Sequence, residues 1–404
     1  MADQEQAVLC EAKDRVRLAT LNRPLQLNVI NSSMVSLLAD YLEKWEKDPH
    51  VELVLIKGNG RAFCAGGDLK MFFGGRNSKD SCLEVAYRMY WLCYHIHTYK
   101  LTNVALANGL AVGGGAAFLV PMTFSVVTEN TVFSTPEASI GYHTDCSFSY
   151  LLSRLPGRMG EFLGLTGARL NGKELVSVGL ATHFVPSGKL GALEEALINL
   201  NKGDVASVKS VIEEFSIDAQ PDDGSVLNKR SIIDDCFSKD GVTEIIASLE
   251  DEAKKKGGEW ALPALKTMIR SSPTGLKVTL KSIREGRAQT LSECLRKEFR
   301  LTINIQRSVV SEDFYEGIRS LTIDKDNNPK WNPSSLEQSD DEKIDLLFAP
   351  FDEDTELCIP TSENDRSSLF PLFLCCGLCF EQQVGWQVRH VVVRPLPVVV
   401  IIVL

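Results

Sequence analysis

Short apolar segments with strand patterning alternate with amphipathic segments between residues 15 and 190, and this alternation limits the folds that the chain can adopt. RVRLATLN (15–22) and VELVLIKGNG (51–60) have the pattern of strands, and MVSLLADYLEKWEKD (34–48) between them has apolar residues at helical spacing. Further strands are predicted at NVALANG, FSVVT and TVFSTP, and a helix at GGGAAFLVPM. Such alternation favours a layered α/β fold with parallel strand pairing.

From Leu190 onward the pattern is mostly helical. Helices are predicted at 191–200, 205–215 and 242–256, and one long helical run extends from Gly275 to Val310. QPDDGS (220–225) is predicted to be an internal loop. The 404 residues are many for one domain, but one large α/β domain with a helical appendage accounts for them.

The two ends of the chain differ in character from its middle. The first residues lack a basic stretch followed by an apolar run, and they lack the Arg-rich character of a mitochondrial presequence, so no targeting segment is expected. Residues 336–366 are acidic and are expected on the surface. In residues 367–404 the apolar runs are shorter than the about 20 residues that a membrane span needs. We expect an atypical, disordered tail there, and a short membrane-interface or partner-binding segment is the alternative.

Charge and cysteine usage argue against two classes of function. The net charge of −10 argues against nucleic-acid binding, because phosphate contacts need clustered Lys and Arg. The eleven Cys do not recur at metal-ligand spacing, so buried, reduced thiols in an intracellular compartment are expected. His95 and His97 would lie together on a strand but not on a helix, so no metal site is expected.

Two carboxylates lie in a turn between predicted buried elements, in the segment STPEASIGYHTDCSFSY (134–150). Glu137 and Asp145 have no Lys or Arg within this segment to neutralise them. Either both side chains point into water, or they face a cavity in which carboxylates take part in chemistry. In a half-buried cavity, desolvation and mutual repulsion would raise their pKa values, which suits general acid–base catalysis.

Two glycine-rich turns follow predicted buried strands: GNGRAFCAGGDLK (58–70) and NGLAVGGGAAF (108–118). Neither has the spacing of a dinucleotide-binding fingerprint or of a phosphate-binding P-loop. One glycine-rich turn alone would only indicate a tight turn. Two turns at the ends of successive strands could each direct one backbone N–H at a single oxygen, as an oxyanion hole in acyl chemistry requires.

The motifs FCAGGDL, GLAVGGGAAF, STPEASIG and LTGARLNGKELVSVGLATHFV resemble the crotonase (enoyl-CoA hydratase/isomerase) superfamily, and the resemblance extends from Val16 to Trp331. Within it, SRLPGRMGEFLGLTGARLNGKEL is most similar to 3-hydroxyisobutyryl-CoA hydrolases, especially a hydrolase-like branch in plants. The resemblance implies a crotonase-like ββα superhelix. Residues 15–190 would form the core with the CoA and active site, and residues 191–335 a helical region that completes the fold.

The resemblance also implies roles for individual residues. Gly67 and Gly114 would supply the two oxyanion N–H groups, and Glu137 and Asp145 would be the catalytic carboxylates facing the acyl group. The remaining positions implied to bind CoA or substrate are Ala65, Gly66, Asp68, Gly113 and, where the hydrolases present a Glu from a helix, Met89. CoA would be part of the substrate, so no separate cofactor is expected.

Position 117 distinguishes the reactions of this superfamily. Hydratases need a second Glu there to add water together with the first acid, and this chain has Ala117. Hydrolysis of a thioester is therefore favoured over hydration. The chain departs from the hydrolase pattern at HTDCSFSY, where Ser147, Phe148 and Ser149 replace glycines, and at Met89.

The resemblance implies a hydrolase that converts 3-hydroxyisobutyryl-CoA to 3-hydroxyisobutyrate and CoA in valine breakdown. Two further interpretations compete with it. One is a catalytically weakened structural subunit of the mitochondrial small ribosomal subunit, a role that resembles that of a protein in the plant branch. The other is an enoyl-CoA hydratase or isomerase. We expect a small acyl-CoA as the partner and no direct nucleic-acid or membrane contact, and a homo-oligomer is one option. The resemblance implies a mitochondrial location, with peroxisomal and cytosolic locations as the alternatives.

The tail supplies the first testable prediction. Deletion of the residues from Ser367 onward should leave the thermal unfolding temperature and the activity unchanged, because the composition there is unlike the rest and the family resemblance has already ended. Differential scanning fluorimetry of the full and truncated chains measures this. A large fall in the melting temperature would identify the tail as a packed element.

Overall fold

The structure is a computed structural model that describes residues 6–78, 82–352 and 354–360. The tail from residue 361 onward therefore lies outside the described residues. Met1–Leu357 forms one compact unit, separate from Cys358–Leu404, and every element named below belongs to the first unit.

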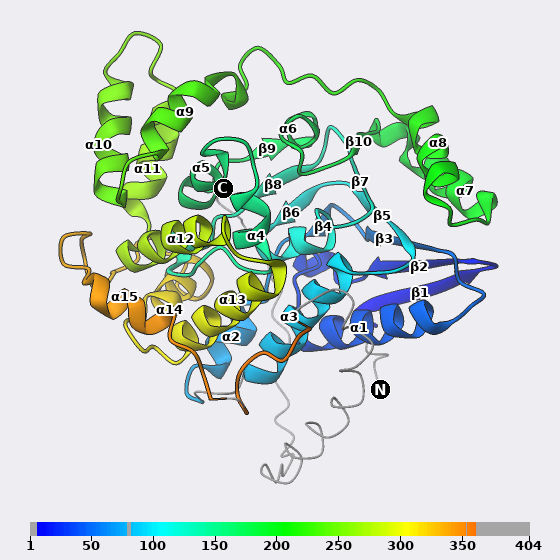
Figure 1. Ribbon diagram of the computed structural model, residues 1–404, viewed down its shortest axis with the longest axis horizontal. Coiled ribbons are helices and arrows are strands. Elements are labelled where there is room, and N and C mark those ends of the chain that lie inside the picture. Colours follow the sequence, from blue (N-terminus) through cyan, green and yellow to red (C-terminus); the bar gives the residue numbers. More distant parts are fainter. Residues whose placement is uncertain (1–5, 79–81, 353, 361–404) are drawn as a thin grey trace. The chain divides into compact units, whose positions relative to one another are not determined.

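A six-stranded sheet forms the larger β layer, with the strand order β1-β2-β3-β5-β7-β10 (Figure 1). The hairpin pair β1–β2 is antiparallel, and every following pair is parallel. The strands are β1 Val8–Lys13, β2 Val16–Leu21, β3 Leu53–Gly58, β5 Thr102–Ala107, β7 Phe124–Val127 and β10 His183–Phe184. The predicted α/β fold with parallel pairing is therefore confirmed. It could be predicted because buried parallel strands are continuous apolar runs, which are visible in the sequence.

A second, four-stranded sheet has the order β4-β6-β8-β9. Its first three strands run parallel, and β9 is antiparallel to β8. The bounds are β4 Ala62–Cys64, β6 Leu110–Val112, β8 Val132–Ser134 and β9 Leu170–Asn171. In the chain, β4 follows β3, β6 follows β5 and β8 follows β7. The chain therefore passes repeatedly from the large sheet to the small one.

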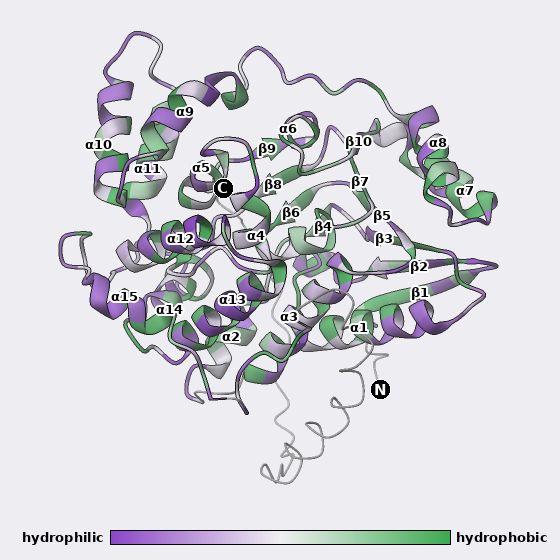
Figure 2. Ribbon diagram, viewed as in Figure 1, coloured by the Kyte–Doolittle hydropathy of each residue, from purple (hydrophilic) through white to green (hydrophobic). Residues whose placement is uncertain are grey.

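Helices cover the large sheet. Two of them, α7 Leu190–Leu200 and α8 Val205–Phe215, pack Leu193, Leu197 and Ile212 against apolar residues of β2, β3, β5 and β7 (Figure 1). The helix α1 Ser32–Lys47 contacts β1 and β2 and begins at Asn31, whose side chain accepts a hydrogen bond from the Met34 N–H. Green, hydrophobic residues gather in the strands in Figure 2, whereas α10 and α15 carry purple residues along much of their length.

The predicted helical region is confirmed, but its longest run is not one helix. It consists of α12 Pro273–Gly286 and α13 Leu291–Gln306, and a capping box of Thr290 and Glu293 starts the second helix. The helix predicted at GGGAAFLVPM was also wrong in type, since the structure has a short 3₁₀ helix, η2 Gly113–Phe118. The other helical elements are η1 Pro24–Gln26, α2 Leu69–Gly75, α3 Leu83–His97, η3 Glu137–Ile140, α4 Phe148–Ser153, α5 Met159–Thr166, α6 Gly172–Val178, η4 Ser187–Lys189, η5 Val226–Lys229, α9 Arg230–Phe237, α10 Val242–Ala253, α11 Ala261–Arg270, α14 Asp313–Ile318, η6 Arg319–Ile323 and α15 Asp341–Leu347.

Both His residues that the sequence placed two apart lie on the helix α3, where that spacing separates them. Their side chains have different partners: His95 contacts Glu46, and His97 forms a hydrogen bond with Ser147. Within the described ranges, no cluster of three or more potential metal-ligating side chains occurs. No helix in that part of the chain is long and apolar enough to cross a bilayer.

The acidic segment expected on the surface contains the helix α15. Its acidic face pairs with lysines of α12, as Asp341 does with Lys277 at 2.9 Å. Its opposite face is buried, and Ile344 and Leu347 pack in an apolar cluster with residues of α12, α13 and α14. The residues up to Leu357 thus contribute to the core and not only to the surface.

Substitution of the two adjacent leucines of α15 tests this contribution. Leu347→Ala should lower the free energy of unfolding by about 2–5 kcal/mol, because Leu347 is 1% exposed and its removal leaves a cavity. Leu346→Ala is the matched control: Leu346 is 53% exposed, so the change should be small. Urea unfolding of both variants measures the difference, and equal values would show that α15 does not pack as described.

Candidate active site

Three parallel strands of the small sheet end at the same edge, and each is followed by a segment that the sequence singled out. The residues 65–68 follow β4, the glycines 113–115 follow β6, and Glu137 follows β8 after two residues. Because β4, β6 and β8 are neighbours and run parallel, their carboxyl ends meet. The four-stranded sheet therefore brings both glycine-rich turns and the first carboxylate to one place, as ligand sites of parallel sheets are built.

The two glycine turns pack backbone against backbone. A Cβ atom on Gly115 would lie 2.3 Å from the carbonyl oxygen of Cys64, a distance that no side chain tolerates. A Cβ on Gly66 would lie 3.1 Å from the carbonyl oxygen of Val112, and Gly66 has a φ of 94°. These glycines are thus required for the close approach of the turns and not only for their curvature.

For the backbone N–H groups of Gly67 and Gly114, the part of the chain that the structure describes shows no acceptor. Among the described residues, no backbone acceptor is found for the Gly67 N–H. Gly114 is the second residue of η2, so its N–H belongs to the first turn and lacks an intrahelical acceptor. Both donors are free to bind an external oxygen, although their joint role as an oxyanion hole stays a prediction.

Glu137 lies against the second glycine turn. Its Oε1 atom would be 2.5 Å from a Cβ placed on Gly113, and the side chain is 7% exposed. The Oε2 atom is buried without a hydrogen-bond partner in the described part of the chain. Burial, and then the negative charge of Asp145, raise the pKa of Glu137 well above its ordinary value. A buried carboxyl with an unpartnered oxygen is suited to act on a ligand.

Asp145 lies between η3 and α4 and is only partly buried. Its Oδ2 atom accepts hydrogen bonds from the Tyr90 hydroxyl at 3.1 Å and from the Cys146 thiol at 3.3 Å. Burial raises the pKa of Asp145 to about 6, and these two hydrogen bonds oppose the rise. The Cys146 sulfur would lie 3.1 Å from a Cβ on Gly114, so Asp145 and the second glycine turn are close neighbours.

The other positions implied to bind CoA or substrate have structural partners. Ala65 donates its N–H to the Leu27 carbonyl. The Asp68 carboxylate pairs with Arg23 at 3.0 Å and caps α2. Ala117 is fully buried within η2, and no acid occupies that position.

The sequence analysis missed two residues beside the acids. Met89 is buried on α3, and the next residue, Tyr90, presents its hydroxyl to Asp145. The carboxylate of Glu298, on α13, is fully buried and accepts hydrogen bonds from the N–H groups of Ser147 and Ser149 at 2.7 and 2.8 Å. An acid on the apolar side of the predicted helical run 275–310 was the available signal for Glu298.

Glu298 completes a group of three buried or half-buried acids. Burial raises the pKa of Glu298 to about 7, and the charge of Asp145 adds to the rise. The charge of Glu298 in turn contributes to the raised pKa of Glu137. The site therefore holds protons near neutral pH that isolated carboxyls would have lost.

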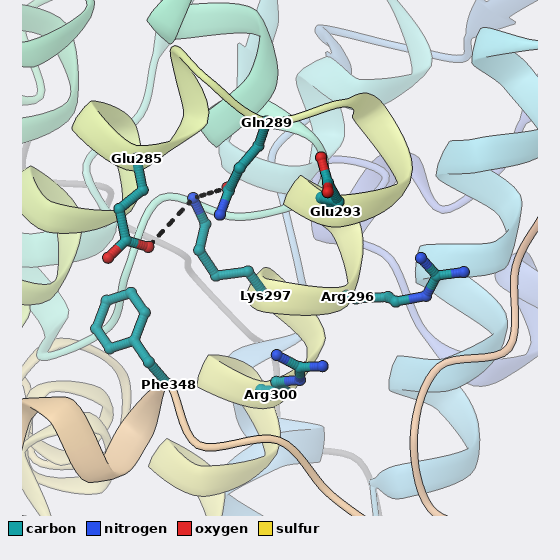
Figure 3. A pocket seen from close by; sticks show the side chains of 7 residues that line it. All are labelled: Glu285, Gln289, Glu293, Arg296, Lys297, Arg300 and Phe348. Atoms are coloured by element: carbon teal, nitrogen blue, oxygen red, sulfur yellow. Dashed lines mark hydrogen bonds and ion pairs between the residues drawn. The ribbon is translucent and has the colours of Figure 1, made fainter. Parts of the chain in front are cut away.

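A separate hollow of about 290 Å³ lies between α12, α13 and α15 (Figure 3). Its lining is charged, and Glu285 and Gln289 both point at the Lys297 ammonium. Lys297 also donates to the Ser282 carbonyl at 2.6 Å. None of the residues that the sequence singled out lines this hollow, and its cations are already paired, so it is not the acyl site.

The chain belongs to the enoyl-CoA hydratase/isomerase family, whose model matches residues 16–348. A carnitinyl-CoA dehydratase from Mycobacterium thermoresistibile has the same fold, with a TM-score of 0.80, 32% identity, and coverage of 88% of this chain and 100% of that chain. This likeness confirms the predicted crotonase-like architecture.

Among the relatives, 3-hydroxyisobutyryl-CoA hydrolase-like protein 5 of Arabidopsis thaliana is 64% identical, over 90% of this chain and 94% of the relative. Two relatives are named 3-hydroxyisobutyryl-CoA hydrolase: hydrolase 1 of Arabidopsis thaliana is 42% identical over 90% of this chain and 97% of that protein, and the mitochondrial enzyme of Homo sapiens is 38% identical over 86% of this chain and 89% of that enzyme. Small ribosomal subunit protein mS47 of Arabidopsis thaliana is 41% identical over 90% of both chains.

The raised pKa of Asp145 predicts a pH-dependent stability. Between the ordinary pKa of an aspartate and about 6, the folded chain binds a proton at Asp145 that the unfolded chain has released, so this group makes folding less favourable as the pH rises through that window. Asp145→Asn removes the effect. The variant should gain stability relative to the parent between pH 4 and pH 7, on the order of 2 °C in melting temperature. A difference that does not change with pH would contradict the raised pKa of Asp145.

Proposed function

We propose that the protein is an acyl-CoA thioester hydrolase that converts a short β-hydroxyacyl-CoA, with 3-hydroxyisobutyryl-CoA as the favoured substrate, into the free acid and CoA. One observation carries this proposal: the buried Glu137 carboxyl lies against a glycine turn that has an unpaired N–H. Relatives named as hydrolases of this thioester, over most of the chain, support it.

In the proposed mechanism the thioester oxygen accepts hydrogen bonds from the N–H groups of Gly67 and Gly114. These donors would stabilise the negative charge that develops on that oxygen when the carbonyl carbon is attacked. In its ionised form, Glu137 either attacks the carbon itself or removes a proton from a water molecule that attacks it, and the raised pKa makes that carboxylate the stronger base. The C–S bond then breaks, the CoA thiolate takes up a proton, and water supplies the hydroxyl of the acid product.

Asp145 is proposed to orient the attacking water or the substrate's β-hydroxyl. Its carboxylate is fixed by Tyr90 and is partly exposed, so one oxygen remains available to a ligand. Hydration is the weaker alternative, because Ala117 occupies the position at which a hydratase carries its second acid. CoA enters only as part of the substrate in this proposal, with no separate cofactor, and mitochondria are the proposed location because a hydrolase relative is mitochondrial by name.

The second candidate function is structural. A relative that is 41% identical is named as a small ribosomal subunit protein, so a chain with this fold can have a role in that particle. The altered turn around Asp145, with serines and Phe148 in place of glycines, favours a changed site. Against it stands the raised pKa of Glu137, since a site without chemistry has no need to keep an unpaired carboxyl buried.

Release of free thiol from 3-hydroxyisobutyryl-CoA separates the two functions. The purified full chain should release CoA thiol, which a thiol-reactive dye follows continuously, whereas a structural subunit should release none above the rate in buffer. Acetyl-CoA and a plain branched acyl-CoA serve as comparison substrates. Absence of release from all three thioesters would overturn the proposed hydrolase.

Substitution of the two acids should divide their roles. Glu137→Gln keeps the shape but removes the basicity, so kcat should fall by about 10²–10⁴ with little change in CoA affinity. Asp145→Asn should cost less and should reduce the rate for β-hydroxyacyl thioesters more than for plain acyl thioesters, because a bond to the hydroxyl is used by only one class. Steady-state kinetics on both classes measures this, and undiminished activity of Glu137→Gln would remove the catalytic role.

A further inference from the structure

The turn that carries Asp145 adopts a backbone conformation that its residues rarely take. Cys146 has a φ of 56° and Ser147 a φ of 75°, so two successive residues with side chains lie in the left-handed region. Glycine adopts this region freely, whereas residues with a Cβ atom are strained there unless the surroundings hold them. Some other contact must therefore keep the turn in this shape.

Glu298 supplies that contact. Its Oε2 atom accepts the Ser147 N–H at 2.7 Å, and its Oε1 atom accepts the Ser149 N–H at 2.8 Å. Glu298, Ser147 and Ser149 are all fully buried. One carboxyl group thus binds the N–H that lies between the two strained residues and the N–H two residues further along the turn.

The helix α13 also holds the side chain of Asp145. The Tyr90 hydroxyl has two acceptors within reach of its one proton, the Asp145 carboxylate and the Glu298 carbonyl at 3.3 Å, and its oxygen lies 2.6 Å from the Thr302 hydroxyl. Thr302 lies four residues after Glu298 and hence on the same face of α13. The backbone beside Asp145 and its carboxylate are therefore fixed from one helix.

We propose that Glu298 is a positioning residue, whose carboxylate imposes the left-handed turn on Cys146 and Ser147 and so directs Asp145 into the site. The inference rests on the proposed hydrolase function. Glu298 acts through the backbone, since both of its oxygens are occupied by N–H groups of the turn and its side chain has no exposed surface.

The test is a cycle of substitutions at positions 298 and 147. Glu298→Gln keeps one acceptor oxygen but offers a donor to the other amide, so the turn should relax. The expected result is a fall in kcat of at least about tenfold on 3-hydroxyisobutyryl-CoA with KM changed less than about threefold, as losing a positioned group implies. Glu285→Gln, which removes an acid from α12 away from the turn, is the matched control and should leave kcat unchanged.

Glycine at position 147 should rescue the variant. Ser147→Gly lets the turn reach a positive φ without help, so adding it to Glu298→Gln should recover at least about fivefold in kcat. Ser147→Ala loses the same hydroxyl bond to His97 but keeps the Cβ atom, so it should give no rescue. Glycine and alanine performing alike, or an undiminished kcat in Glu298→Gln, would overturn the positioning role.

The melting temperatures of the same variants test the role of Glu298 even if the protein shows no hydrolase activity. In the Glu298→Gln background, Ser147→Gly should melt higher than Ser147→Ala, and the difference should exceed that in the parent. If Glu298→Gln does not fold, recovery of folded protein by glycine and not by alanine supports the role, and recovery by neither overturns it. An inactive parent would instead overturn the proposed hydrolase and leave the melting cycle to judge Glu298.

Discussion

The site depends on the contact between the turn after β4 and the turn after β6. There Gly115 lies so close to the Cys64 carbonyl that any Cβ atom would collide with it. Gly66 packs tightly against the Val112 carbonyl and has a positive φ that favours glycine. Because the two strands are parallel neighbours, this contact fixes the separation of their two free N–H groups. Everything else at the edge of the small sheet is placed relative to this pair of turns.

The acids around these turns form the second constraint. Burial raises the pKa of Glu137, Asp145 and Glu298, and the charge of Asp145 adds to the rise at the other two. In the described ranges no Lys or Arg forms an ion pair with any of the three. Such an arrangement lowers the stability of the fold, because removing a charge from water is unfavourable. The hydrogen bonds from Tyr90 and from the two serine amides offset part of that cost. Residues of α3 and α13 therefore contribute to the stability of this one short turn.

Much of the architecture could be predicted because its signals are local. Buried strands such as 51–60 and the amphipathic helix 34–48 can be recognised from their composition and from the spacing of their apolar residues. The glycine-rich turns and the pair Glu137 and Asp145 could be selected in the same way. The failures have physical reasons. The segment predicted as a helix at GGGAAFLVPM starts with Gly113 at a φ of 53°, outside the helical region, and forms only a short 3₁₀ helix. The run 275–310 is divided because a capping box at Thr290 starts a new helix, a signal that hydrophobic spacing alone does not contain.

The apolar side of the run 275–310 marks Glu298 as a buried acid, but nothing local identifies its partners, which are amides about 150 residues earlier in the chain. Tyr90 was hidden in the same manner, one residue from the position that the resemblance indicated. Their roles arise from the packing of α13 on α3 and α4, which only the folded chain displays.

This separation along the chain has a consequence for how the site comes into being. The sheets and both glycine turns are complete by residue 184, but the turn at Asp145 acquires its shape only when α13, more than one hundred residues later, has docked. During synthesis the N-terminal part emerges first and can fold while the rest is still being made. A nascent or truncated chain would thus have both sheets formed while Asp145 is not yet held in place. Packing of the C-terminal helices would be the step that completes the site.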